Sequence, residues 1–118
     1  MKKEKVICKD KIAVDFNDGK ELLQDLGKSV TIFGSARTSS DDKYAKLAEK
    51  LAFRLSKKNI NVITGGGNGI MQAANKGAFE AKTAESIGLS IYLPNEKTKN
   101  EYTTKSLTFN YFFSRKYM

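Results

Sequence analysis

The chain has 118 residues, of which 21 are lysine or arginine and 13 are aspartate or glutamate, so its formal net charge is +8. This length permits one domain with a modest core, and the positive charge suits an anionic ligand, either a small phosphate compound or a nucleic acid. The sequence has no histidine and one cysteine, which excludes an internal disulfide and removes the usual general base and the commonest metal ligands. We therefore expect neither a metal nor another cofactor. No apolar run approaches the ~20 residues of a membrane span, and the charged start leads into no signal-peptide core, so we expect a cytoplasmic protein without membrane contacts.

The first 40 residues contain one expected helix and one expected strand. Residues 1–15 have only short apolar patches and are expected to be irregular. A helix is predicted to begin at Asn17 or Asp18 and to stop at Gly27, with leucines on one face. Residues 29–34 are rich in β-branched side chains and predict the first core strand. A small polar loop follows, in which Arg37 is the only cation.

The middle of the chain alternates between helix and strand patterns. Ser40 or Asp41 can cap a helix that runs to about residue 58. Residues 60–64 predict a second strand, residues 69–82 a second helix with a face of small residues, and residues 87–93 a third strand that stops at Pro94. Residues 107–113 are aromatic-rich and predict an extended segment. The first of these helices carries an apolar stripe at helical spacing, formed by Tyr44, Leu47, Ala48, Leu51, Ala52 and Leu55.

This alternation predicts an α/β, Rossmann-like parallel sheet with helices on both faces. We divide the chain into an N-terminal extension with a helix, residues 1–28, and a Rossmann-like nucleotide-binding domain, residues 29–118. In the usual doubly wound order the first strand is central, so residues 30–33 would form an open sheet edge and the sheet would end after its first half. Either the chain is a fragment or it pairs with another chain.

The most informative stretch is the glycine-rich loop after the second expected strand, in which positions 65, 66, 67 and 69 are glycine. Glycines let the backbone turn tightly and let a ligand come close, and the following helix start presents unpaired N–H groups to an anion. A tight turn without a ligand is the alternative. A dinucleotide fingerprint would need glycine where Ile70 or Gln72 stands, and a P-loop would need Lys-Ser or Lys-Thr after Gly69. The loop therefore suits a mononucleotide or a sugar phosphate.

Several motifs in this order resemble the amino-terminal half of the Lonely Guy family, nucleotide phosphoribohydrolases long mislabelled as lysine decarboxylases. They lie at residues 34–37 (Gly-Ser-Ala-Arg), 64–71 (Thr-Gly-Gly-Gly-Asn-Gly-Ile-Met), 74–78, 86–96 and 112–118. Members of that family split a nucleoside 5′-monophosphate into the free base and ribose 5-phosphate, and they are dimers. The resemblance thus implies an AMP-like or cytokinin-type nucleotide substrate and a homodimer.

The resemblance also implies roles for individual residues. Arg115 matches the catalytic arginine, while Arg37 is as readily an exposed cation as a phosphate contact. The other residues that the resemblance implicates are those of the phosphate cradle and the helix start that follows it, Gly66, Gly67, Gly69 and Ile70, with Ser35 lining the nucleotide pocket and Met118 near the base.

One family signature is absent from these 118 residues. It is Pro-Gly-Gly-x-Gly-Thr-x-x-Glu, whose glutamate would polarise the attacking water and bind the ribose hydroxyls. We therefore expect this chain alone to be inactive, since nothing aims the loop carboxylates Glu96 and Glu101 at the cleft. Two alternatives remain open: a non-catalytic nucleotide- or phosphate-binding module, and a basic nucleic-acid-binding domain. Nucleic acid is the less favoured partner, because the lysines are scattered and have no interleaved aromatic stripe.

Overall fold

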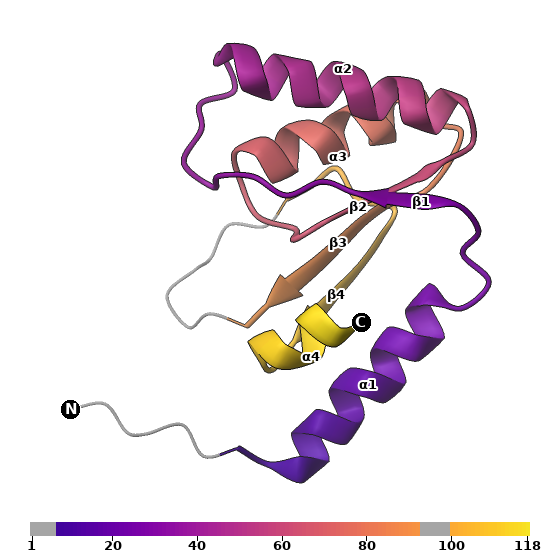
Figure 1. Cartoon of the computed structure of the whole chain (residues 1–118), viewed down its shortest axis with the longest axis vertical. Helices are drawn as coiled ribbons and strands as arrows, with labels where there is room; N and C mark the ends of the chain where they lie inside the picture. Colours follow the sequence, from indigo (N-terminus) through magenta and orange to yellow (C-terminus); the bar gives the residue numbers. More distant parts are fainter. Residues whose placement is uncertain (1–6, 93–99) are drawn as a thin grey trace.

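Four parallel strands form a single sheet in the computed structural model, which describes residues 7–92 and 100–118 (Figure 1). The strands are β1 (Ser29–Thr31), β2 (Asn61–Thr64), β3 (Ser86–Ile91) and β4 (Lys105–Phe109), and they lie in the order β1-β2-β3-β4. Helices α2 (Lys43–Lys57) and α3 (Ile70–Ala81) cover one face, whereas α1 (Lys9–Leu23) and α4 (Phe112–Tyr117) lie on the other. The predicted α/β class with a Rossmann-like parallel sheet is confirmed.

Alternating residues of each strand face opposite layers of the molecule, as the pleat of a β-strand requires. Val62 packs towards α2 and α3, while its neighbour Ile63 packs towards α1 and α4. The layer on the α1 side contains the larger side chains, with Phe109 and Ile87 fully buried. The other residues of that layer are Leu22, Leu23, Leu26, Leu89, Leu107 and Met118. The sheet is thus held from both sides by separate apolar layers.

Helices α2 and α3 pack through small residues, and this corrects the expected stripe on α2. Gly77 of α3 lies so close to the backbone of Glu49 that an added Cβ would collide with the Glu49 carbonyl oxygen. Ala45, Ala48 and Ala52 of α2 are buried at this contact. The larger members of the predicted stripe, Tyr44, Leu47 and Leu51, are 48–60% exposed, because the close helix contact has no room for them.

Helix α1 begins eight or nine residues earlier than expected, since the structure places its start at Lys9 and its end at Leu23. The earlier part of the helix was not expected because residues 1–15 show only short apolar patches, and Gly19 lies inside the expected helix although glycine costs about 1 kcal/mol in a helix interior. In the structure Gly19 is buried against α4 and β4, where a Cβ would lie 2.7 Å from the Met118 sulfur. The close packing of α1 on Met118 therefore requires glycine at position 19, despite its low helix propensity.

Two further boundaries differ from the expectation. The aromatic stretch 107–113 is not one extended segment, because β4 ends at Phe109 and α4 begins at Phe112. Helix α2 is capped by Asp42 rather than by Ser40 or Asp41, since the Asp42 carboxylate accepts the Tyr44 N–H at 2.8 Å. Pro94, the expected stop of the third strand, lies outside the described residues.

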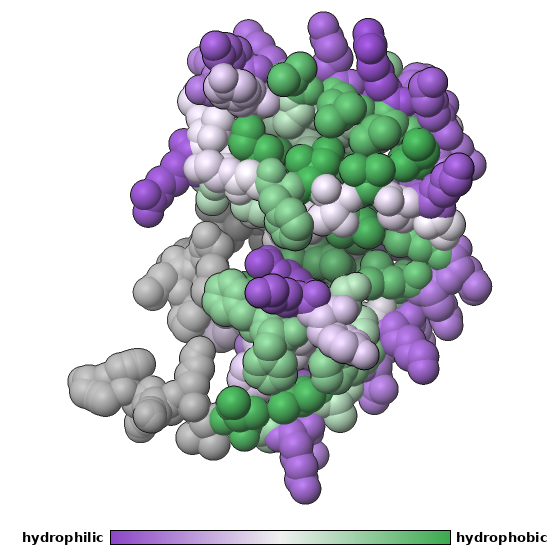
Figure 2. All heavy atoms as spheres, in the orientation of Figure 1, coloured by the Kyte–Doolittle hydropathy of each residue, from purple (hydrophilic) through white to green (hydrophobic). Residues whose placement is uncertain are grey.

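The open edge expected at the first strand is present. Among the described strands β1 has one neighbour, β2, and its three residues are all exposed. Beside this edge the face in Figure 2 carries hydrophobic residues over α2, rimmed by hydrophilic side chains. Within the described residues, no helix has the length and apolar character needed to cross a membrane.

Candidate functional site

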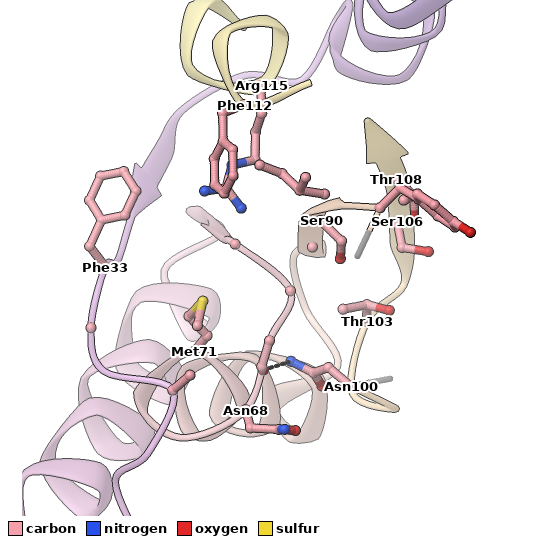
Figure 3. A pocket seen from close by; sticks show the side chains of 18 residues that line it. Phe33, Asn68, Met71, Ser90, Asn100, Thr103, Ser106, Thr108, Phe112 and Arg115 are labelled. Carbon is pink, nitrogen blue, oxygen red and sulfur yellow. Dashed lines mark hydrogen bonds between the residues drawn. The ribbon is translucent and has the colours of Figure 1, made fainter. Parts of the chain in front are cut away.

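The candidate site is a cleft of about 690 Å³ at the carboxyl ends of the strands, above the glycine-rich loop (Figure 3). Ligands of open α/β sheets bind at this end of the strands, and ligand pockets commonly measure about 300–1,000 Å³. The glycine loop, α4 and the β3–β4 face form its walls, and the residues that line it include Phe33, Gly65, Gly66, Gly67, Asn68, Met71, Asn100, Phe112 and Arg115.

The β3–β4 wall of the cleft carries hydroxyl groups. Ser90 of β3 lies directly opposite Thr108 of β4 in the strand register, and Gly88 lies opposite Ser106. The hydroxyl side chains of Ser90, Ser106 and Thr108 share one wall of the cleft with Thr103, on a different side from Phe33 and Phe112 (Figure 3). The cleft therefore has a polar, uncharged wall and an aromatic wall.

A buried amide, Asn75 of α3, holds the glycine loop from below. The Thr64 hydroxyl donates to the Asn75 side-chain oxygen and accepts the Gly66 N–H at 3.0 Å. The Asn75 side-chain nitrogen donates to the Ser86 hydroxyl at 2.9 Å. The Asn100 amide donates to Asn75 at 2.8 Å and to the Gly67 carbonyl at 3.4 Å. One fully buried side chain thus joins β2, β3 and Asn100, which lies in the segment between β3 and β4, to the loop.

Some backbone N–H groups of the glycine loop already donate to protein acceptors, and others are available to a ligand. The Gly66 N–H donates to Thr64, and the Ile70 N–H donates to the Ser35 carbonyl at 3.0 Å. Within the described part of the chain, the N–H groups of Gly67, Asn68 and Gly69 have no acceptor. Three consecutive free N–H groups just before a helix are suited to an anion such as phosphate.

Gly69 has a backbone that favours glycine, with φ 69° and ψ −129°. An added Cβ would also collide with the Ser35 carbonyl oxygen. The loop after β1 and the loop after β2 therefore touch backbone to backbone. The Ser35 hydroxyl accepts the Arg37 N–H at 3.0 Å, so it is engaged in shaping the first of these loops.

Arg115 reaches from α4 into the cleft beside Phe112 (Figure 3). Its Nη1 donates to the Leu89 carbonyl at 3.2 Å, and its guanidinium carbon lies 5.6 Å from the centre of the Phe112 ring. Burial lowers the pKa of Arg115 below its usual value, but an arginine side chain keeps its positive charge in proteins. Among the described residues it has no carboxylate partner, so this charge is available to an anionic ligand.

A second groove of about 560 Å³ adjoins the cleft and is lined mainly by apolar side chains of the sheet and of α4. The two cavities share Phe33, Gly65, Phe112 and Arg115. Met118 lies in this second groove, together with Leu23 and Ile63. Arg115 therefore stands at the boundary between a polar cleft and an apolar groove.

The structure brings three of the predicted site residues together at the cleft: Gly66, Gly67 and Arg115. Gly69 and Ile70 form the turn into α3 behind the cleft lining, in contact with Ser35. The remaining predicted residues stand apart from this lining: Ser35 and Arg37 are exposed in the loop after β1, and Met118 lies in the adjoining groove.

The sequence interpretation missed the residues that hold the site in place. Asn75 is an amide on the small-residue face of α3, and Asp15 is a carboxylate inside an apolar stretch of α1. A polar side chain at a position that helical spacing assigns to the buried face was the available signal. Asn100 carried no such signal, because it stands in a polar loop.

No aspartate or glutamate lines the cleft among the described residues. Glu101 is exposed and outside the lining, and Glu96 lies outside the described residues. The described cleft can therefore bind and neutralise an anion, but it offers no carboxylate to activate a water molecule.

Comparison with known proteins places this architecture in a family. The model of the SLOG cluster4 family matches residues 27–115. The chain belongs to the SLOG cluster4 family. This match confirms the resemblance to the amino-terminal part of Lonely Guy proteins. The SLOG match begins after α1, which lies wholly before residue 27.

A solved relative shows the same fold. The X-ray structure of TM1055, a target of the Northeast Structural Genomics Consortium, is 26% identical in sequence and superposes with a TM-score of 0.50. The alignment covers 69% of this chain and 46% of that chain, so the SLOG cluster4 chain spans about half the length of its solved relative. No curated protein matches the sequence.

Proposed function

We propose that this SLOG cluster4 chain binds a nucleoside 5′-monophosphate such as AMP in the cleft. The free N–H groups of Gly67, Asn68 and Gly69 would receive the 5′-phosphate, and the Arg115 guanidinium would supply the neutralising charge. The observation that carries this proposal is the pairing of three unpaired N–H groups with a cation that has no carboxylate partner among the described residues. A net charge of +8 also favours an anionic ligand.

We further propose that the chain is the nucleotide-binding half of a phosphoribohydrolase. In that reaction water adds to the anomeric carbon of the ribose, the N-glycosidic bond breaks, and the base leaves with a proton, giving ribose 5-phosphate. Arg115 would stabilise the departing base or hold the phosphate, whereas a carboxylate must take the proton of the water. The described cleft lining lacks that carboxylate, so turnover requires one from outside the described residues.

A second candidate is a nucleotide-binding module without catalysis. The same observation favours it, since a cleft that holds an anion but no carboxylate can bind a nucleotide without hydrolysing it. Cytoplasmic location and self-association remain parts of the proposal under either candidate.

Arg115→Ala is expected to weaken AMP binding about tenfold or more, because a hydrogen bond to a charged group contributes about 1.5–3 kcal/mol. Isothermal titration with AMP measures this, and adenosine serves as the ligand without a phosphate. Lys116→Ala is the matched control, because it removes the neighbouring cation of α4, which lies outside the cleft lining. Arg115→Lys should recover part of the loss, since it restores the charge without the planar fork.

Three results would contradict these statements. Equal affinity for AMP and adenosine would refute the phosphate site. An equal loss of AMP affinity in Lys116→Ala and Arg115→Ala would show that only the net charge of the protein matters, not the position of Arg115. Release of adenine by the 118-residue chain, followed by chromatography, would show that a carboxylate does reach the cleft.

The proposed homodimer has its own test on the exposed apolar side chains of α2. Tyr44, Leu47 and Leu51 lie on the exposed side of that helix, and apolar patches of this kind often mark protein interfaces. Leu47→Glu should abolish a dimer detected by sedimentation equilibrium, whereas Lys50→Glu, which changes an exposed cation on the same helix, should not. A wild-type chain that sediments as a monomer would remove this part of the proposal.

A further inference from the structure

We propose that helix α1 is a functional part of the binding site, in which the Asp15 carboxylate fixes the junction between β4 and α4 and thereby positions Arg115. Helix α1 lies outside residues 27–115, the segment that the SLOG cluster4 model matches. Asp15 is a positioning residue in this account, because it does not line the cleft itself. The inference rests on the proposed function, which assigns Arg115 to the ligand.

The contact between Asp15 and the β4–α4 junction is dense and buried. Asp15 is 2% exposed. One oxygen of its carboxylate accepts the backbone N–H and the side-chain amide of Asn110, both at 2.9 Å. The other oxygen accepts the N–H of Tyr111 at 3.2 Å and that of Asn110 at 3.1 Å. Hydrogen bonds to an ionised acceptor are about twice as strong as neutral ones, so this carboxylate holds two consecutive backbone units.

Helix α4 depends on that carboxylate for its starting point. It has six residues, and its N-cap residue Tyr111 makes no side-chain capping hydrogen bond. A helix this short is unstable by itself, because isolated helices below about 12–15 residues are marginal in water. The Asp15 carboxylate accepts the N–H groups of Asn110 and Tyr111, the two residues that precede α4, and so fixes the path by which the chain enters the helix.

Three other contacts seat α1 along the same segment. Gly19 lets α1 approach Met118, since a Cβ there would lie 2.7 Å from its sulfur. The Cys8 N–H donates to the Tyr111 hydroxyl at 2.9 Å. The rings of Phe16 and Tyr117 meet edge to face with centroids 5.3 Å apart. Together with Asp15, these contacts reach α4 near both of its ends.

The consequence concerns the direction of the Arg115 side chain. Among the described residues, its side chain makes one hydrogen bond to a carbonyl and one stacking contact with Phe112, a residue of the same helix. Neither contact holds α4 against the rest of the molecule as tightly as four hydrogen bonds to one buried carboxylate. Burying a carboxylate costs desolvation free energy, and an apolar side chain of similar size would often pack there with equal or greater stability. Its presence here fits a requirement for a fixed orientation of the segment that carries Arg115.

The test measures AMP affinity of the full 118-residue chain by isothermal titration in a double-mutant cycle. Asp15→Ala should weaken AMP binding about tenfold, comparable to the loss of one charged hydrogen bond. Asp18→Ala is the matched control, because Asp18 is exposed on the same helix and its side chain makes no hydrogen bond or ion pair within the described residues. Combined with Arg115→Ala, the Asp15 substitution should cause no further loss, since coupled residues do not act additively.

A second variant and a spectroscopic signal keep the test decisive if Asp15→Ala fails to fold. Asp15→Asn has nearly the same shape and keeps one acceptor oxygen, so it should fold and show a smaller loss of affinity. In the nitrogen–proton NMR spectrum the side-chain Nε–H signal of Arg115, assigned by its loss in Arg115→Ala, should shift in Asp15→Asn and stay unchanged in Asp18→Ala. A change of global stability alone would not move this signal selectively.

The outcomes separate the two proposals. If Arg115→Ala weakens AMP binding while the Asp15 variants bind normally, the positioning role of α1 is overturned and the proposed function stands. An equal loss from Asp15→Ala with and without Arg115 would also overturn it, because Asp15 would then act on stability in general. If Arg115→Ala leaves AMP binding intact, both the function and the positioning role are refuted.

Discussion

Gly77→Leu is expected to destabilise the protein by about 3 kcal/mol, at the upper end of the usual cost of overpacking a core. At Gly77 the atom that an added Cβ would meet is the carbonyl oxygen of Glu49. Because this oxygen belongs to the backbone of α2, the collision cannot be relieved by a change of rotamer. The two helices would have to separate, which would open the contact between Ala48 of α2 and the small-residue face of α3.

Gly77→Ala is the sharper version of this experiment, because two effects have opposite signs. Helix propensity alone predicts that alanine stabilises the helix by about 1 kcal/mol relative to glycine. The collision with Glu49 predicts a net loss of stability instead. Urea unfolding followed by circular dichroism measures the sign, and Glu80→Ala, an exposed change on the same helix, should stay within about 0.5 kcal/mol of the wild type. A stabilised Gly77→Ala variant would mean that α2 and α3 are less closely packed than the structure shows.

The elements predicted well from the sequence are those whose signals are local. The strands that lead into the two loops of the site, and the helices that follow them, were expected within a few residues of their observed bounds, because β-branched runs and helical spacing are read from neighbouring residues. The glycine loop was recognised for the same reason, since its composition alone requires a special backbone. The open edge at β1 followed from the strand order that such a fold adopts.

The elements predicted poorly depend on contacts between distant segments. The first half of helix α1 was missed because residues 9–16 have only short apolar patches, and the buried Asp15 among them is explained by the segment around β4 and α4 almost a hundred positions later. The start of α4 was read as extended for the same reason, because the carboxylate that satisfies its entry is supplied by α1. On α2 the spacing of Leu47 and Leu51 correctly indicated a helix but not which of its faces is buried.

The candidate site likewise has a part that was predicted from local motifs and a part that was not. Gly66, Gly67 and Arg115 were predicted from local motifs, and the structure brings them to one cleft. The chemistry proposed for them remains to be measured. The motifs contain Thr64, Asn75 and Ser86 but do not show that these residues support the loop, because their hydrogen bonds join separate elements and involve Asn100, which lies in no motif.

Asn75→Leu is expected to have the largest effect on the site itself. Leucine is close to asparagine in size, but it removes the buried acceptor of the Thr64 hydroxyl and of the Asn100 amide, whereas the Ser86 hydroxyl keeps the Tyr102 carbonyl as a partner. Each unsatisfied buried group costs about 1–3 kcal/mol, and the coupled losses should total about 3 kcal/mol or more. The free energy of unfolding from urea titration measures this loss, with Asn17→Leu as a control, because Asn17 is an exposed amide on α1.

The local consequence of Asn75→Leu distinguishes support of the loop from a general loss of stability. The Gly66 N–H is bonded to the Thr64 hydroxyl, which Asn75 holds in place. Relative to the wild type, hydrogen exchange of the Gly66 amide should therefore accelerate by a much larger factor than exchange of amides in the middle of α2, which take no part in the hydrogen bonds of the Asn75 side chain. AMP affinity should fall about tenfold as well, because the N–H groups of Gly67 to Gly69 lose their fixed direction. If all amides exchanged faster by the same factor, Asn75 would stabilise the whole fold without a particular role in the loop. Selective exchange at Gly66 would instead establish that one buried amide determines the shape of the proposed phosphate site.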